Sequence, residues 1–350
     1  MSSLKFVIFL LGSTALAIVA GLSINLAIDP YSVFGSKLLP KFGQVEERYL
    51  KIEYLKSHPH FNTFLLGSSR IGVIRTEDVN AVFRGAQSYN MTASQSNQWD
   101  AEKNIEWLIK NIPNLSRVIV QIDWPWTYGE AKPGYELLTA VHPDISGRNK
   151  FRFLSDYLTL FNMEAINAKF VNNFGGANTP IYDMSNGYWS MPIREKQISG
   201  DCSYAEKEPA FHIKRPATSK TSPQTLLDSL ASIERYKALL DKASVKLTII
   251  LTPQNRLAID PIDFEDYEMF IKRLANITEF YDFMYYNKLT KNDCNYYEAS
   301  HYRPIVGKII LHSLTDQSDA NSEIFKFVSK DNLDEKLKFF KANFSSERAD

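Results

Sequence analysis

The chain is poor in cysteine and has no excess of charge of either sign. Its 350 residues include only two cysteines, Cys202 and Cys294, and 40 basic side chains balance 40 acidic ones. Neither cysteine belongs to a CxxC pair or lies near clustered histidines, so a zinc site has no support. The two could form a disulfide or remain free buried thiols. The balanced charge argues against nucleic acid as a partner, and the sequence predicts no cofactor and no metal.

A long run without charged residues extends from Phe6 to Ile28. About 23 residues, at 1.5 Å each, are enough to cross a hydrocarbon core of about 30 Å. The run exceeds the roughly 7–15 residues of a signal-peptide core, which favours an uncleaved signal anchor over a cleaved signal peptide. Lys5 before the run and Asp29 after it argue weakly for a cytoplasmic N-terminus. We therefore expect a single-pass protein of the bacterial inner (cytoplasmic) membrane, with most of the chain periplasmic or extracellular.

Apolar runs alternate with amphipathic stretches in the rest of the chain. We predict buried strands at residues 62–66, 117–123, 246–252 and 281–286, and helices at residues 96–112, 223–243 and 263–276. This alternation predicts a mainly parallel sheet covered on both faces, a flavodoxin-like three-layer α/β/α fold. In such folds, ligands bind beyond the carboxyl ends of the strands.

The same patterns divide the chain into four parts. Residues 1–29 form the signal anchor, residues 30–60 a connector, residues 61–316 the α/β domain, and residues 317–350 a polar tail with a short helix. Inside the domain, residues from about 124 to 221 are irregular and rich in Tyr, Asn, Gly and Pro. We interpret them as an insertion that covers or shapes a site.

Three short motifs lie at the ends of predicted elements, where a Ser-His-acid site would need them. The first is GSSR at residues 67–70, in which glycine permits a sharp turn that exposes a serine hydroxyl. Alone, such a turn is more typical of a structural feature such as a helix cap. In the second, Glu298 precedes His301 by three residues, a spacing that lets a carboxylate orient the imidazole. The third, at residues 88–94, could direct N–H groups toward an oxyanion.

In this order, the motifs resemble the SGNH (GDSL-like) hydrolase superfamily over residues 61–314. In that superfamily, a serine in a first block, backbone and asparagine donors in middle blocks, and a C-terminal DxxH form the site. The similarity is greatest to membrane-anchored members, such as the D-alanyl-transfer protein of teichoic-acid modification and the SGNH partners of membrane-bound O-acyltransferases. Those often have a GSSR-like first block and a C-terminal block similar to YEASHYRP at residues 297–304.

The resemblance implies a role for each matching residue. Ser69 would be the nucleophile, with Ser68 as the alternative, and His301 would be the general base. Glu298 stands where the superfamily usually has aspartate, and either carboxylate can orient an imidazole. Asp293 is a less well spaced substitute for that acid.

Two departures from the pattern concern the oxyanion donors. The middle-block glycine is replaced near Thr92, and the GxND block corresponds at best to residues 121–124, which contain no asparagine. An ionised Asp123 would repel an oxyanion, so Asn90 or backbone groups would have to donate instead. Arg70, beside the nucleophile, either holds a carboxylate or phosphate of the substrate or braces the turn through a salt bridge.

Together these residues favour a membrane-anchored serine esterase or O-acyltransferase that acts on an envelope glycan or lipid-linked saccharide through a Ser-His-Glu triad. The expected partners are that glycan, an acyl donor and a membrane-bound O-acyltransferase. The rival hypothesis is a catalytically degenerate scaffold that serves as a glycan-binding or assembly subunit. A third hypothesis, a structural membrane protein, requires the serine and the histidine to lie far apart.

Four aromatic residues could form a wall on which sugar rings stack, or they could be ordinary core residues. They are Trp124, Trp126, Tyr128 and Trp189.

Overall fold

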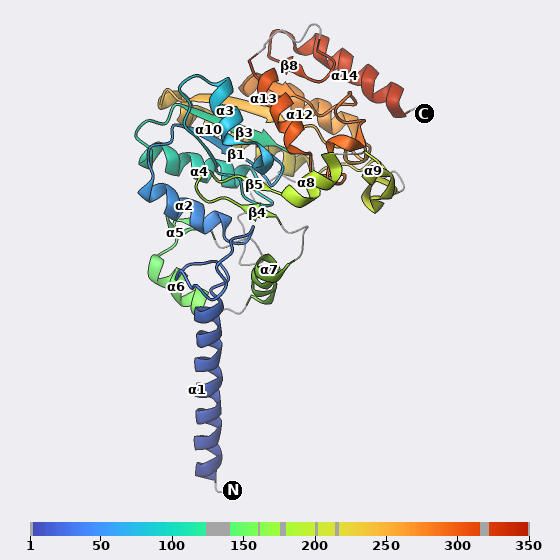
Figure 1. The fold of residues 1–350 in the computed structure, drawn as a ribbon. Helices are drawn as coiled ribbons and strands as arrows, with labels where there is room; N and C mark the ends of the chain where they lie inside the picture. Colours follow the sequence, from blue (N-terminus) through green and yellow to red (C-terminus); the bar gives the residue numbers. More distant parts are fainter. Residues whose placement is uncertain are drawn as a thin grey trace. The chain divides into compact units, whose positions relative to one another are not determined.

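The computed structural model describes residues 3–123, 141–159, 162–175, 180–199, 202–213, 217–315 and 322–348. The chain divides into two compact units (Figure 1). We call the first, residues 1–53 and 133–180, the anchor unit, and the second, residues 54–132 and 181–350, the sheet unit.

The anchor unit begins with α1, Ser3–Ile28, the long helix at the N-terminus in Figure 1. Its 26 residues span about 39 Å at 1.5 Å per residue. The helix is long and apolar enough to cross a membrane, which confirms the expected N-terminal apolar helix.

The rest of the anchor unit surrounds a small core that contains both apolar and charged side chains. Its helices are α5 (Pro143–Ser146), α6 (Lys150–Thr159), α7 (Met163–Phe174) and the first part of α2 (Glu47–Ser57). Tyr31, Val45 and Tyr157 pack together in its interior. A buried ion pair lies in the same unit, where Lys169 Nζ is 2.6 Å from Glu46 Oε1. Such a pair is tolerated in an interior because each charge compensates the other.

The sheet unit contains a six-stranded sheet with the order β2-β1-β3-β6-β7-β8. The neighbouring pairs from β2 to β7 are parallel, and only β8 is antiparallel to its neighbour. The sheet therefore confirms the predicted α/β class and the mainly parallel strands. The strands are β1 (Thr63–Leu66), β2 (Ser88–Asn90), β3 (Arg117–Ile122), β6 (Lys246–Leu251), β7 (Phe280–Asp282) and β8 (Lys326–Val328).

The central strands are buried along most of their length, as continuous apolar runs in parallel sheets require. Leu65 of β1 lies opposite Asn90 of β2 and Ile119 of β3 in the register. Because these three strands run in the same direction, the turns that follow them leave the sheet at one edge. This edge carries the candidate site.

Helices pack beside the sheet in two sets. In the first, α10 (Pro223–Lys242) contacts both α4 (Gln98–Asn111) and α12 (Phe264–Ile277), and α12 contacts α14 (Leu333–Arg348). In the second, α3 (Thr76–Val82) contacts α13 (Pro304–Ser313). Local signals set their starts, because Asn97 and Asp100 form a capping box on α4 and proline opens α10 and α13. The remaining helices are α8 (Pro192–Ser199), α9 (Tyr204–Lys207) and α11 (Arg256–Ile259).

Two parts of the sheet unit differ from the sequence-based expectation. The strand expected at residues 281–286 ends at Asp282, because the Asp282 carboxylate accepts the Met284 N–H at 2.7 Å and turns the backbone. The region expected to be a polar tail contains β8 and the 16-residue α14. Phe340 and Phe344 of α14 are buried, so this helix packs as part of the domain.

Candidate active site

The turn after β1 has a shape that requires glycine at position 67. Gly67 has a φ of +155°, and a Cβ at this position would lie 2.7 Å from the Cβ of Gln121. The Thr92 hydroxyl donates to the carbonyls of Gly67 at 3.1 Å and Ser68 at 2.5 Å, which fixes the turn from β2. The chain then enters the short 3₁₀ helix at residues 71–73 and leaves Ser69 partly exposed.

The loop before α13 carries the histidine and its acid. An antiparallel bridge between Tyr296 and Tyr302 closes this loop, and the Tyr297 N–H donates to the His301 carbonyl at 2.8 Å. The closed loop turns Glu298 back onto the imidazole, so that Nδ1 of His301 hydrogen-bonds Oε1 of Glu298. The three-residue spacing thus works because the loop is a tight hairpin.

Ser69, His301 and Glu298 form a connected series. Ser69 Oγ lies 2.7 Å from His301 Nε2, and His301 Nδ1 contacts Glu298. When Nδ1 donates its proton to Glu298, Nε2 is free to accept the proton of the Ser69 hydroxyl. The structure therefore brings together the three residues predicted as the triad, although the serine and the histidine are 232 positions apart.

The Glu298 carboxylate remains ionised down to acidic pH. Burial alone would raise its pKa, but hydrogen bonds from His301 and Ser300 and the charge of the imidazolium lower the pKa to about 2. The Ser300 N–H donates to Oε2 of Glu298 at 2.7 Å, and its hydroxyl donates to the same atom at 2.8 Å. The role of Ser300 could not be predicted from the sequence, because its position beside the histidine was the one signal that it carried.

Ser68 and Arg70, the neighbours of Ser69, are buried and bind Asp123. The Ser68 hydroxyl donates to Oδ2 of Asp123, and Nη1 of Arg70 lies 2.9 Å from that same oxygen. The Arg70 and Asp123 side chains are only 6% and 0% exposed. Nε of Arg70 also donates to the carbonyl of Ser300 at 2.6 Å. Of the two interpretations of Arg70, the structure therefore supports the salt bridge that braces the turn.

Asp123 joins the ends of three strands. Besides the groups on the turn after β1, its carboxylate accepts hydrogen bonds from Gln121 Nε2 on β3 and, at 2.5 Å, from the Thr252 hydroxyl after β6. Gln121 Oε1 in turn accepts the Ile71 N–H at 2.9 Å. Asp123 is therefore a buried, charge-compensated support of the turn and does not act as the oxyanion donor of a GxND block.

The side chains of Asn90 and Thr92 are engaged by the backbone. The amide nitrogen of Asn90 donates to the carbonyls of Ile71 at 2.9 Å and Ile74 at 3.2 Å, so both of its hydrogens are used. The Thr92 hydroxyl donates to the turn. The expectation that Asn90 donates to an oxyanion is thus corrected, because its side chain instead braces the segment after Ser69.

Trp189 packs against the site from the short hairpin of β4 (Ile181–Tyr182) and β5 (Trp189–Ser190). Its indole Nε1 donates to the Ser69 carbonyl at 2.8 Å, and its ring lies edge-on to the His301 ring at 6.1 Å between centroids. Trp189 is buried, so it positions the site and offers no open stacking face. Trp124, Trp126 and Tyr128, the other members of the expected wall, lie outside the described residues.

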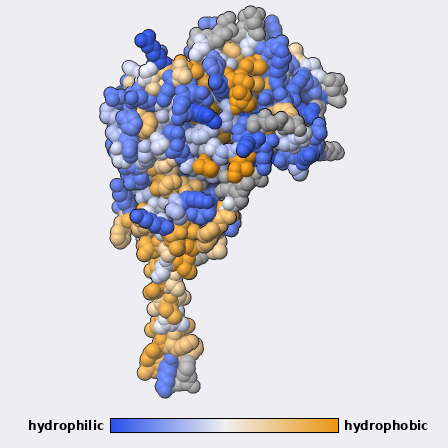
Figure 2. All heavy atoms as spheres, in the orientation of Figure 1, coloured by the Kyte–Doolittle hydropathy of each residue, from blue (hydrophilic) through white to orange (hydrophobic). Residues whose placement is uncertain are grey.

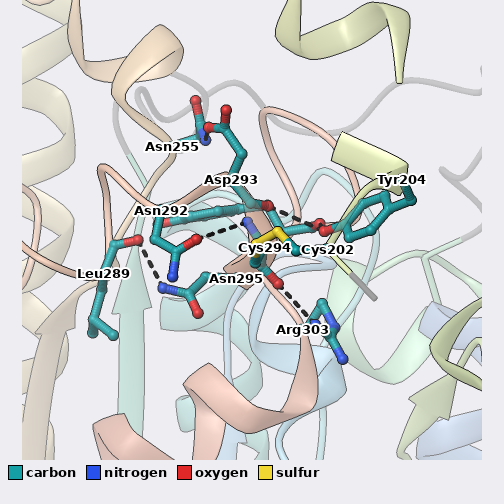
Figure 3. Close-up of a disulfide and its surroundings, with 10 residues drawn as sticks. Cys202, Tyr204, Asn255, Leu289, Asn292, Asp293, Cys294, Asn295 and Arg303 are labelled. Carbon is teal, nitrogen blue, oxygen red and sulfur yellow. Dashed lines mark hydrogen bonds between the residues drawn. A yellow bond between two sulfur atoms is a disulfide. The ribbon is translucent and has the colours of Figure 1, made fainter. Parts of the chain in front are cut away.

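A disulfide between Cys202 and Cys294 holds the chain just before the histidine loop (Figure 3). The Cα atoms of the two cysteines are 5.5 Å apart. The Cys294 carbonyl accepts Nη1 of Arg303 at 2.8 Å, and Asn255 Nδ2 donates to the Asp293 carboxylate at 2.7 Å. Asp293, the alternative acid, is bound to Asn255, whereas Glu298 contacts the imidazole.

Within the described residues, no group of three or more His, Cys, Asp or Glu side chains could hold a metal ion. No protein-family model matches the chain, and no curated protein sequence is similar to it. Serine, imidazole and carboxylate in series remain the chemically informative feature of the molecule. Such a series can activate a hydroxyl as a nucleophile and return its proton to a leaving group.

Proposed function

We propose that this chain is a membrane-anchored serine esterase or O-acyltransferase of the SGNH superfamily, acting on an ester of an envelope glycan or lipid-linked saccharide. The observation that carries the proposal is the 2.7 Å contact between Ser69 Oγ and His301 Nε2, with Nδ1 held by Glu298. Its position beyond the carboxyl ends of a mainly parallel sheet, where ligands bind in such folds, supports the proposal. The two sets of helices beside the sheet fit the flavodoxin-like three-layer arrangement expected for this superfamily.

The reaction would pass through an acyl-enzyme. His301 takes the proton of the Ser69 hydroxyl while Oγ attacks the acyl carbonyl carbon. Collapse of the tetrahedral intermediate breaks the ester bond, and His301 gives its proton to the departing alcohol. Water or a sugar hydroxyl, deprotonated by His301, then attacks the acyl carbon. The bond from this carbon to Ser69 Oγ breaks, His301 returns the proton to Oγ, and the product is a free acid or a new ester. Glu298 stabilises the imidazolium that exists between these proton transfers.

A backbone group would stabilise the oxyanion. The Ser69 N–H makes no hydrogen bond to an acceptor elsewhere in the described parts of the chain, and it is adjacent to the attacking oxygen. We assign it as one donor. The side chains of Asn90 and Thr92 are excluded because they bind carbonyls.

The anchor and the disulfide support a location outside the cytoplasm. A disulfide persists in oxidising compartments, and α1 could hold the sheet unit near lipid-linked or envelope substrates. A membrane-bound O-acyltransferase is the proposed partner that would supply or receive the acyl group.

The engaged Asn90 side chain favours one alternative, a degenerate scaffold that binds a glycan without acylating Ser69. Losing one oxyanion donor typically lowers kcat by about 10²–10³-fold, and neither Asn90 nor Asp123 supplies one here. Reactivity of Ser69 separates the two hypotheses, because an activated serine reacts with a fluorophosphonate and an inert serine does not.

The test uses the full chain in detergent micelles, labelled with a fluorophosphonate probe and assayed with p-nitrophenyl acetate. The native chain and Ser68→Ala should be labelled, whereas Ser69→Ala should not. Absence of labelling in the native chain would favour the scaffold. Labelling that persists in Ser69→Ala would remove this residue as the nucleophile. His301→Gln, which keeps a polar side chain near Ser69, should react with the probe far more slowly.

A further inference from the structure

Exposed apolar side chains are concentrated in the anchor unit. Beyond α1, the described residues expose fourteen large apolar side chains, of which nine belong to the anchor unit and five to the much larger sheet unit. Figure 2 shows apolar residues gathered around the point where α1 joins the rest of its unit. Contiguous exposed apolar surface of this kind marks an interaction site.

Helix α7 has an apolar outer face. Its exposed positions Met163, Phe170, Val171 and Phe174 recur with the spacing of one helix face, and Phe174 is 74% exposed. Phe170 and Phe174 stack on this face with their ring centroids 6.1 Å apart. The opposite face, which points into the unit, consists of Ala165, Ile166 and the ion-paired Lys169. A helix on a water-exposed surface would instead carry polar side chains on its outer face.

Helix α6 and the segment after α1 extend this apolar surface. On α6, Phe151 is 82% exposed and Leu154 is also exposed. Between α1 and α2, the exposed apolar residues are Phe34, Leu38 and Phe42. We call the exposed apolar residues of α6, α7 and this segment the platform.

Hydrogen bonds tie α6 to the carboxyl end of α1. Asn25 Nδ2, in the last turns of α1, donates to the Leu158 carbonyl at 2.9 Å, and the Tyr157 hydroxyl donates to the Asp29 carboxylate at 2.6 Å. The end of α1 and the end of α6 therefore lie at the same level. If α1 crosses a bilayer, its last turns and α6 lie at the membrane–water interface.

Helix α7 is tied to the segment that leaves α1. Asn162 Nδ2 donates to the Tyr31 hydroxyl at 3.0 Å at one end of α7, and the Lys41 N–H donates to Asn173 Oδ1 at 3.1 Å at the other. Both ends of the helix are thus fixed to residues within about a dozen positions of the membrane helix. An apolar helix held there has lipid as its nearest apolar medium.

We propose that the platform lies in the interfacial layer of the same bilayer that α1 crosses, so that the part of the anchor unit outside α1 is an interfacial membrane element and not a flexible tether. Interfacial helices bury their apolar face about 5–10 Å into the boundary of headgroups and acyl chains. The platform's phenylalanines fit this layer, and the exposed Lys37 can extend to headgroups. Continuity with α1 is what selects lipid over a second protein as the occupant.

The test measures the depth of single labels in the full chain, reconstituted into phosphatidylcholine vesicles. Both native cysteines are in the disulfide, so an introduced cysteine is the one free thiol for an environment-sensitive fluorophore. Asn167→Cys places the label on the exposed face of α7 and keeps every apolar side chain. Ser13→Cys in α1 marks the bilayer interior, and the exposed Lys341→Cys on α14 marks water. Lipids with brominated acyl chains and aqueous iodide are the two quenchers.

The proposal expects the Asn167→Cys label to shift to shorter wavelength and to be quenched by brominated lipid, as the Ser13→Cys label is. The Lys341→Cys label should be quenched by iodide alone. Adding Phe170→Asp and Phe174→Asp should abolish lipid quenching at Asn167→Cys and leave it unchanged at Ser13→Cys. Iodide quenching equal to that of Lys341→Cys would overturn the proposal. Protection from both quenchers would also overturn it, because a protein surface would then cover α7.

Discussion

Removing one partner of the ion pair between Arg70 and Asp123 should strongly destabilise the sheet unit. Both side chains are almost fully buried, and their charged atoms are 2.9 Å apart. Arg70→Met would remove the guanidinium that compensates the buried Asp123 carboxylate. Breaking a buried pair by removing one partner costs about 3–5 kcal/mol, against a total stability of about 5–15 kcal/mol for a domain. Since 1.4 kcal/mol is a factor of ten, the folded-to-unfolded ratio should fall by about 10²–10⁴.

A double-mutant cycle separates the pair from its surroundings. Asp123→Asn removes the other charge and keeps a side chain that can still accept hydrogen bonds. The double variant, with both changes, has no uncompensated charge, so it should be less destabilised than the sum of the single variants by about 1–3 kcal/mol. Lys220→Met is the matched control, because Lys220 and Glu265 form an ion pair whose side chains are 67% and 81% exposed. That variant should leave the free energy of unfolding almost unchanged, because water and salt screen an exposed pair.

The assay is urea unfolding in detergent micelles, followed by tryptophan fluorescence, with fluorophosphonate labelling of Ser69 measured in parallel. Because Arg70 also holds the Ser300 carbonyl beside the histidine, labelling should slow in Arg70→Met before the fold is lost. A loss of stability equal to that of the Lys220→Met control would refute the reasoning. So would additivity of the two single variants, since it would mean that the charges do not compensate each other.

Three further results are expected. Glu298→Gln should lower the rate of p-nitrophenyl acetate turnover by about 10²–10⁴-fold, because the neutral amide no longer stabilises the imidazolium of His301; an unchanged rate would contradict the triad. Reduction of the Cys202–Cys294 disulfide, which closes 92 residues, should lower the free energy of unfolding by about 4–5 kcal/mol, measured by urea unfolding with and without a reductant. Burial of Asp282 raises its pKa to about 7, against opposing hydrogen bonds from Tyr267 and Met284, so the folded state binds this proton more tightly than the unfolded state. The stability from Asp282 is then full below about pH 4 and is lost as pH rises to about 7, a decline of about 4 kcal/mol that should be absent in Asp282→Asn; parallel pH profiles for both proteins would exclude it.

Much of the architecture could be predicted because local patterns determine it. The apolar runs became β1, β3 and β6, and the turn after β1 and the loop before α13 converge as their places at strand ends suggested. In contrast, β8 has only three residues, too few for any alternation of polar and apolar side chains to be seen. The full length of α14 was not predicted, because Phe344 is the one large apolar residue in the helix beyond Phe340.

The support around the triad could not be predicted, because it depends on side chains that meet across strands. In the sequence, Asp123 lies where the GxND block would have an oxyanion donor, and a carboxylate cannot serve as one. Its contacts with Ser68 and Arg70 depend on the parallel register of the strands. The sequence suggests that the Asn90 amide is available to a ligand. In the structure it donates to two carbonyls of the segment after Ser69, those of Ile71 and Ile74. Sequence spacing gives the order of groups along the chain and not the pairing of hydrogen bonds between segments.

The guanidinium of Arg70 bridges the first strand of the sheet to a loop made 230 positions later. During synthesis, the N-terminal half of the sheet unit is made first, and it contains Ser69 and Arg70. At that stage the chain lacks both His301, the base for Ser69, and the Ser300 carbonyl that Arg70 binds. Contacts so distant along the chain form late, since closing large loops is slow. Every shortened product that ends before residue 301 thus lacks the base that activates Ser69, and chemical competence begins only once the histidine loop has been made.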